Sequence, residues 1–130
     1  MHRLYKVPDD FEASIRILSF EEGGRQSPPF NGIRWDFCYA EDAPAKHLWM
    51  IWPDFMDEQG NSLLTDELLP VGVNLAARMT VLVDEMRVEV HRKRLAVGSM
   101  FYCHEGSKQV AVGQVTKITG LFNERPSRSL

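Results

Sequence analysis

The fold is decided by residues 11–40, FEASIRILSFEEGGRQSPPFNGIRWDFCYA. The run from residue 11 to residue 19 carries apolar side chains at alternate positions, which is the pattern of a half-buried β-strand. Paired glycines and prolines then indicate a structured loop over residues 21–32, because glycine adopts positive φ and proline restricts the chain. Residues 34–40 alternate again, and their aromatic side chains are expected to face the core.

Further β-strands are expected along the rest of the chain. The alternating or continuously apolar runs that predict them are residues 47–52, 73–83, 86–90, 96–103 and 109–119. Residues 65–69 fit either a loop or one helical turn. Six or seven short strands joined by glycine-rich turns predict an all-β fold, a closed antiparallel β-barrel without exposed edges. The side chains expected to be mainly buried are Ile15, Ile17, Trp35, Phe37, Tyr39, Val81, Phe101 and Val115.

Length and composition favour one domain. A chain of 130 residues with 44% hydrophobic content can bury one core, whereas two cores would each be close to the lower size limit. We expect an N-terminal extension over residues 1–10, the barrel over 11–122 and a tail over 123–130. The chain contains no apolar run typical of a signal peptide or of a membrane-spanning helix, so a cytoplasmic location without membrane contact is expected.

The charge is unevenly distributed. Residues 1–70 contain 13 acidic and 6 basic side chains, a net charge of −7, whereas residues 71–130 contain 5 acidic and 9 basic side chains, a net charge of +4. The basic half is compatible with an anionic partner, but the acidic total lacks the broad basic surface of a dedicated nucleic-acid binder. The basic run His91-Arg92-Lys93-Arg94 fits either a phosphate-binding patch or an exposed turn.

The cysteine and histidine residues suggest no metal site. Cys38 and Cys103 both lie in apolar segments, so they are expected to be small buried side chains rather than a disulfide. The histidines are too far apart in the sequence to suggest zinc ligands. No metal and no cofactor is therefore expected.

Three blocks of the sequence resemble the third, C-terminal domain of bacterial elongation factor Tu. The first is residues 17–37, with Glu21 through Arg25, Pro28, Phe30, Gly32 and Arg34 matching the family's E-E-G-G-R-H-T-P-F-F loop and the strand after it. The second, residues 78–81, is similar to its K-M-T-V strand. The third, residues 101–118, resembles its closing hairpin at Glu105, Gly106, Val110, Gly113 and residues 115–118. These blocks follow the family's order and cover roughly half of the chain, whereas residues 41–75 and 84–98 depart from the pattern.

The resemblance implies a stand-alone, non-catalytic six-stranded barrel. In the family this domain packs on other protein domains and helps to hold the T-stem of aminoacyl-tRNA. The chain has no phosphate-binding G-x-x-x-x-G-K-[ST] loop, so neither GTP nor GDP is expected to bind. The positions that the resemblance proposes for RNA or partner contact are Arg25, Gln26, Arg34, His104, Glu105, Gly106 and Lys108, of which Gln26, His104 and Lys108 differ from the family's residues.

Two functions follow from these observations, and the sequence leaves both open. The first is a protein-interaction module linked to translation, which would use the divergent aromatic segment 47–55. The second is a stand-alone tRNA-binding domain that contacts the RNA backbone through Arg25 and Lys108, which are expected to lie on one surface. No enzyme is expected, because no nucleophile and base can be placed together from their spacing.

Overall fold

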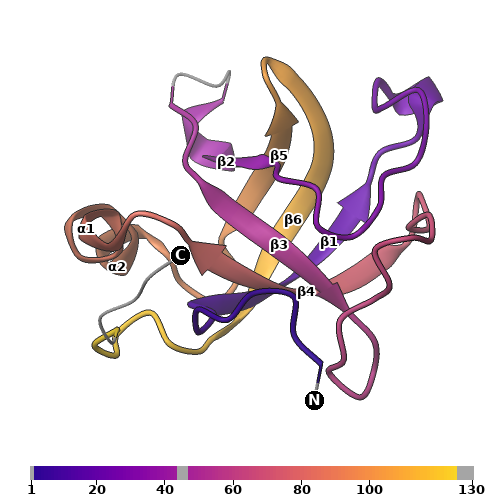
Figure 1. Cartoon of the computed structure of the whole chain (residues 1–130). Helices are drawn as coiled ribbons and strands as arrows, with labels where there is room; N and C mark the ends of the chain where they lie inside the picture. Colours follow the sequence, from indigo (N-terminus) through magenta and orange to yellow (C-terminus); the bar gives the residue numbers. More distant parts are fainter. Residues whose placement is uncertain (1, 44–46, 126–130) are drawn as a thin grey trace.

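The computed structural model describes residues 2–43 and 47–125 and consists mostly of β-structure (Figure 1). Six strands form one antiparallel sheet in the order β2-β5-β6-β1-β4-β3. Their bounds are β1 Phe11–Ile17, β2 Asp36–Tyr39, β3 Ile51–Met56, β4 Asn74–Val81, β5 Met100–Glu105 and β6 Lys108–Ile118. Short 3-10 turns follow β1 and β2, namely η1 Phe20–Glu22 and η2 Ala40–Asp42.

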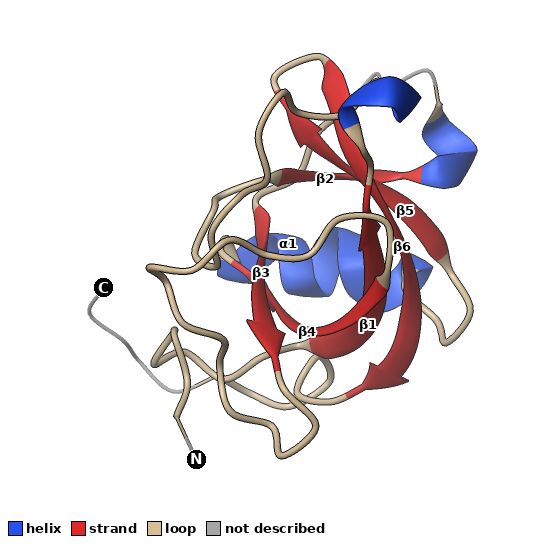
Figure 2. Ribbon diagram, turned by 90° about the vertical axis from the view of Figure 1, so that its right-hand side faces the viewer, coloured by secondary structure: helices blue, strands red, loops and turns tan. Residues whose placement is uncertain are grey.

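The sheet curls into a half-barrel and does not close (Figure 2). Edge strand β2 is joined to the segment just before edge strand β3 by one isolated bridge, in which the backbones of Phe37 and Trp49 exchange two hydrogen bonds of 2.8 Å. No longer ladder forms because β2 has four residues and passes directly into η2. The expectation of an all-β antiparallel sheet is confirmed, and the expectation of a closed barrel is wrong.

The core lies inside the curl of the sheet. All eight side chains that the alternation assigned to the core are buried: Ile15, Ile17, Trp35, Phe37, Tyr39, Val81, Phe101 and Val115. Phe37 and Phe101 stack with ring centroids 4.5 Å apart. Gly113 on β6 makes room for Phe101, since a Cβ atom there would lie 2.2 Å from its ring.

The third strand begins later than the sequence indicates and continues past a proline. Residues 47–52 were expected to form a strand ending before Pro53, but β3 runs through Pro53 to Met56. This is possible because β3 pairs only with β4, and an edge strand tolerates a residue without a backbone N–H. Residues 65–69 form a loop, in which Leu68 bridges to Phe30.

The expected strand at residues 86–90 is wrong, because residues 84–94 are helical. The segment consists of α1 Asp84–Met86, the π-helical η3 Arg87–His91 and α2 Arg92–Arg94, and it crosses the curled sheet in Figure 2. A helical turn brings Arg87 and His91 to the same side, and both are buried there. Val88, which lies between them, is exposed.

The cysteines and the ends of the described chain complete the fold. Cys38 and Cys103 are buried free thiols, as expected, and burial raises the pKa of Cys103 to about 12. Residues 2–10 contact the loop after β3, where the backbone N–H of His2 donates to Asn61 Oδ1 at 2.9 Å. The last five residues of the expected tail lie outside the described part of the chain.

No helix in residues 2–43 and 47–125 is long and apolar enough to cross a membrane.

Candidate functional site

The two loops proposed from the sequence for RNA or partner contact meet in space. Arg25, in the loop after η1, forms an ion pair with Glu105 at the end of β5, and its Nε donates to Ser27 O at 3.1 Å. Glu105 also accepts a hydrogen bond of 2.7 Å from Trp35 Nε1. Lys108 is opposite Glu105 in the β5–β6 register. These loops therefore form one rim, but the charge of Arg25 is already paired.

The other proposed contact residues differ in how accessible they are. Gln26 and Gly106 are exposed, and Gly106 has the positive φ of 58° that its turn requires. Arg34 is exposed, and its guanidinium lies 4.5 Å from the centroid of the Trp52 ring. His104 is buried, so it offers little surface to a partner.

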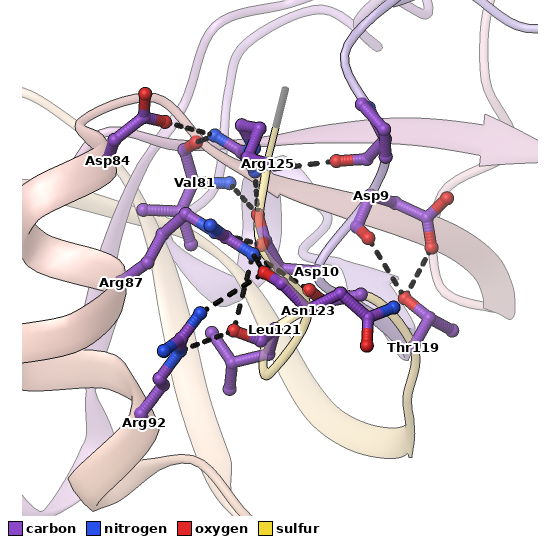
Figure 3. Close-up of polar contacts among 12 residues, drawn as sticks. Asp9, Asp10, Val81, Asp84, Arg87, Arg92, Thr119, Leu121, Asn123 and Arg125 are labelled. Atoms are coloured by element: carbon purple, nitrogen blue, oxygen red, sulfur yellow. Dashed lines mark hydrogen bonds and ion pairs between the residues drawn. The ribbon is translucent and has the colours of Figure 1, made fainter. Parts of the chain in front are cut away.

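The basic run at residues 91–94 makes most of its polar interactions with other residues of the same chain. His91 is buried, and Arg92 donates to the backbone oxygens of Leu121 at 2.7 Å and Asn123 at 3.1 Å (Figure 3). Arg94 pairs with two carboxylates of η2, and its hydrogen bonds hold the pKa of Asp42 below the usual value. Lys93 is exposed. The run is therefore not a free phosphate-binding patch.

A buried carboxylate holds two more arginines. Asp10 accepts hydrogen bonds from Arg87 Nε at 2.6 Å, Arg125 Nη2 at 2.6 Å and the backbone N–H of Val81 at 2.7 Å. Figure 3 shows both guanidinium groups converging on it, and Arg125 also pairs with Asp84 at 2.8 Å. This cluster, the Asp10 clamp, ties together the start of β1, the end of β4, the helical segment and the chain after β6.

Most described arginines are therefore neutralised by carboxylates of the same chain. The seven in such ion pairs are Arg3, Arg16, Arg25, Arg78, Arg87, Arg94 and Arg125. The net charge of +4 after residue 70 consequently does not correspond to a surface of unpaired guanidinium groups.

The segment 47–55, proposed from sequence as a binding loop, mainly forms edge strand β3. Its interior side chains Ile51 and Phe55 belong to the core. His47 and Met50 remain exposed beside a recess of about 280 Å³ that Trp49 and His91 also line. The aromatic side chains of this segment therefore contribute more to packing than to a free binding loop.

A larger recess, of about 630 Å³, lies at the loop between β3 and β4. It is called here the 57–70 recess, and its walls include Leu63, Leu64, Leu68 and Leu69 together with Asp57 and Glu67. Leu64 and Leu68 are exposed to 57% and 58% and line the same hollow, unlike apolar side chains that are exposed singly. The sequence interpretation did not identify this site.

No family model matches this chain. Within the described ranges, no three His, Cys, Asp or Glu side chains are grouped so that they could hold a metal ion. The 57–70 recess combines a hollow with exposed apolar side chains.

Proposed function

We propose that this chain is a non-catalytic β interaction module that resembles the third domain of elongation factor Tu and binds a protein partner linked to translation. The observation that supports a protein partner is the 57–70 recess, where exposed leucines surround a hollow. Exposed apolar side chains that line a hollow are typical of interaction surfaces, because covering them removes apolar area from water. The resemblance in the flanking strands supports the link to translation.

The alternative, a tRNA-binding domain, has weaker support. Binding to the RNA backbone depends on cationic groups that replace counterions at phosphates. Arg25 would have to leave Glu105 to do this, and Arg94 would have to leave Glu41 and Asp42. Each exchange would lose an existing ion pair, which reduces the gain from a phosphate contact.

The proposal is tested by comparing protein and RNA binding directly. Immobilised protein is incubated with nuclease-treated lysate, in parallel with its Leu64→Asn/Leu68→Asn variant, and bound proteins are quantified by mass spectrometry. We expect a partner that resists nuclease and is lost from the variant. The matched control, Val88→Asn/Val97→Asn, changes two exposed valines elsewhere and should retain the partner.

A contrary result is equally clear. If the retained proteins disappear on nuclease treatment and purified tRNA shows a salt-dependent mobility shift, the tRNA-binding alternative replaces the proposal.

A further inference from the structure

The chemistry of the 57–70 recess defines the partner more closely. The sequence from residue 47 to residue 77 contains no Lys or Arg. Asp57 and Glu67 line the recess, and the neighbouring Glu58 and Asp66 are exposed. An occupant of this site would therefore meet negative charge around an apolar centre.

Within the described part of the chain, these four carboxylates form no ion pair. Among residues 2–43 and 47–125, eight acidic side chains pair with arginines, namely Asp9, Asp10, Glu22, Glu41, Asp42, Asp54, Asp84 and Glu105. Asp57 instead accepts the backbone N–H groups of Gln59 and Asn61, both at 2.9 Å, which fix its turn. Its net negative charge is left for an external cation.

The recess is held in place by the fold. Ser62, in its wall, donates to Asp54 Oδ2 at 2.7 Å, and this carboxylate pairs with buried Arg78. The backbone of Leu63 donates to Phe55 O, and the backbone of Leu69 donates to Pro29 O, each at 2.8 Å. A preformed site loses less conformational entropy on binding than a loop that must first become ordered.

We propose that the 57–70 recess binds a Lys/Arg-rich amphipathic segment of the partner protein. Apolar side chains of that segment cover Leu64 and Leu68, and its cationic groups lie against Asp57 and Glu67. The inference rests on the proposed function, since it takes the partner to be a protein. The same carboxylates repel phosphate, so this surface is unsuited to RNA.

The test uses fluorescent synthetic peptides and the whole chain. The probe is a short amphipathic peptide of leucine and lysine; one control peptide has glutamate in place of lysine, and the other has serine in place of leucine. Fluorescence anisotropy at low and high salt measures each affinity. We expect only the leucine–lysine peptide to bind, with affinity that falls as salt rises. Amide chemical-shift changes should be concentrated at residues 57–70.

Two pairs of variants locate the interaction. Asp57→Asn/Glu67→Gln should weaken binding by about three- to tenfold and reduce the salt dependence, whereas Glu85→Gln/Glu89→Gln, which neutralises two exposed carboxylates on the helical segment, should stay within about twofold. Leu64→Asn/Leu68→Asn should weaken binding by about tenfold or more through lost apolar contact. Val88→Asn/Val97→Asn should leave it unchanged within about twofold.

The inference is overturned if the leucine–lysine peptide fails to bind, if the glutamate peptide binds equally, or if Asp57→Asn/Glu67→Gln binds like the wild type. The proposed function is judged separately in lysate. A nuclease-resistant partner that remains bound to Asp57→Asn/Glu67→Gln would contradict this inference and leave the proposed function standing. The absence of any such partner for the wild type would contradict the proposed function itself.

Discussion

Tyr39 Oη and His91 Nδ1 form a buried hydrogen bond of 2.7 Å that joins edge strand β2 to the helical segment. Trp49 contacts His91 edge to face, with ring centroids 5.0 Å apart, and the guanidinium of Arg94 lies 3.9 Å from the centroid of the Tyr39 ring. Burial, together with the charge of Arg94, lowers the pKa of His91 to about 4. The helical segment is thus attached where the two edges of the sheet meet.

Stability should fall between pH 6.5 and about 4 because of His91. In the unfolded chain this histidine takes up a proton near its ordinary pKa of 6.5, whereas the folded protein keeps it neutral down to about 4. The unfolded state therefore binds more protons in this range, and the free energy of unfolding decreases as pH falls, by up to about 1.4 kcal/mol per pH unit. Urea denaturation at several pH values measures the slope.

Two histidine variants separate this effect from the titration of carboxylates. His91→Gln should reduce the slope in that range, and His47→Gln, which changes an exposed histidine, should preserve it. An unchanged slope in His91→Gln would show that other groups cause the pH dependence.

The Phe37→Ala variant should lower the free energy of unfolding by about 3–5 kcal/mol, because it removes a ring from the centre of the core. Phe37 is 1% exposed and contacts the rings of Phe11, Tyr39 and Phe101. Chemical denaturation measures the loss, with Phe20→Ala as the control at an exposed phenylalanine. A loss below about 1 kcal/mol for Phe37→Ala would contradict the assignment of the core.

The Asp10→Asn variant should be less stable than the wild type by about 3–5 kcal/mol, because Arg87 and Arg125 would lose their shared buried carboxylate. The control is Asp84→Asn, at a more exposed partner of Arg125, which should cost about 1 kcal/mol or less. Thermal and urea unfolding of both variants provide the comparison. Equal losses would mean that burial of the Asp10 clamp adds nothing to its strength.

Transfer RNA should show no mobility shift below about 0.1 mM protein, even at low salt. A dissociation constant of about 0.1 mM is the weak limit of non-specific nucleic-acid affinity, so it sets the threshold of the test. The physical reason is the pairing of Arg25 with Glu105. Were a shift observed, Arg25→Ala and Lys108→Ala should each weaken it for all tRNAs alike. The slope of log affinity against log salt should then fall in magnitude by roughly 0.7–0.9 per lost contact.

Local pattern was sufficient to predict the core, because alternation at residues 13–17 and 35–39 directly reports which side of a strand is buried. It failed at residues 86–90, where the same alternation occurs in a helical segment. Arg87 of this segment pairs with Asp10, which is 77 positions away, and short-range periodicity carries no information about such a pair. The prediction of a closed barrel was wrong for a similar reason. Closure depends on how many residues of the edge strands β2 and β3 pair with each other, and a sequence pattern that is read locally does not show this.

The candidate site was predictable only in part. The sequence interpretation selected the loops at residues 21–25 and 105–108, but the ion pair of Arg25 with Glu105 that joins them becomes visible only in three dimensions. For the 57–70 recess, the absence of Lys and Arg over residues 47–77 was an available signal. The exposure of Leu64 and Leu68 could not be predicted from the sequence, because an apolar residue in a loop is equally compatible with burial.

The central position of β1 has a consequence for how the protein folds. Ala13 lies between Ala77 on β4 and Val115 on β6, so the strand made first pairs with strands made much later. Closing these long loops costs entropy before the pairing compensates, and β-topologies of this kind fold in milliseconds to seconds. During synthesis the apolar side of β1 must wait for residue 115 to leave the ribosome, and in that interval it can associate with other chains. Chaperone capacity and growth temperature are therefore expected to control how much of the protein accumulates in folded form.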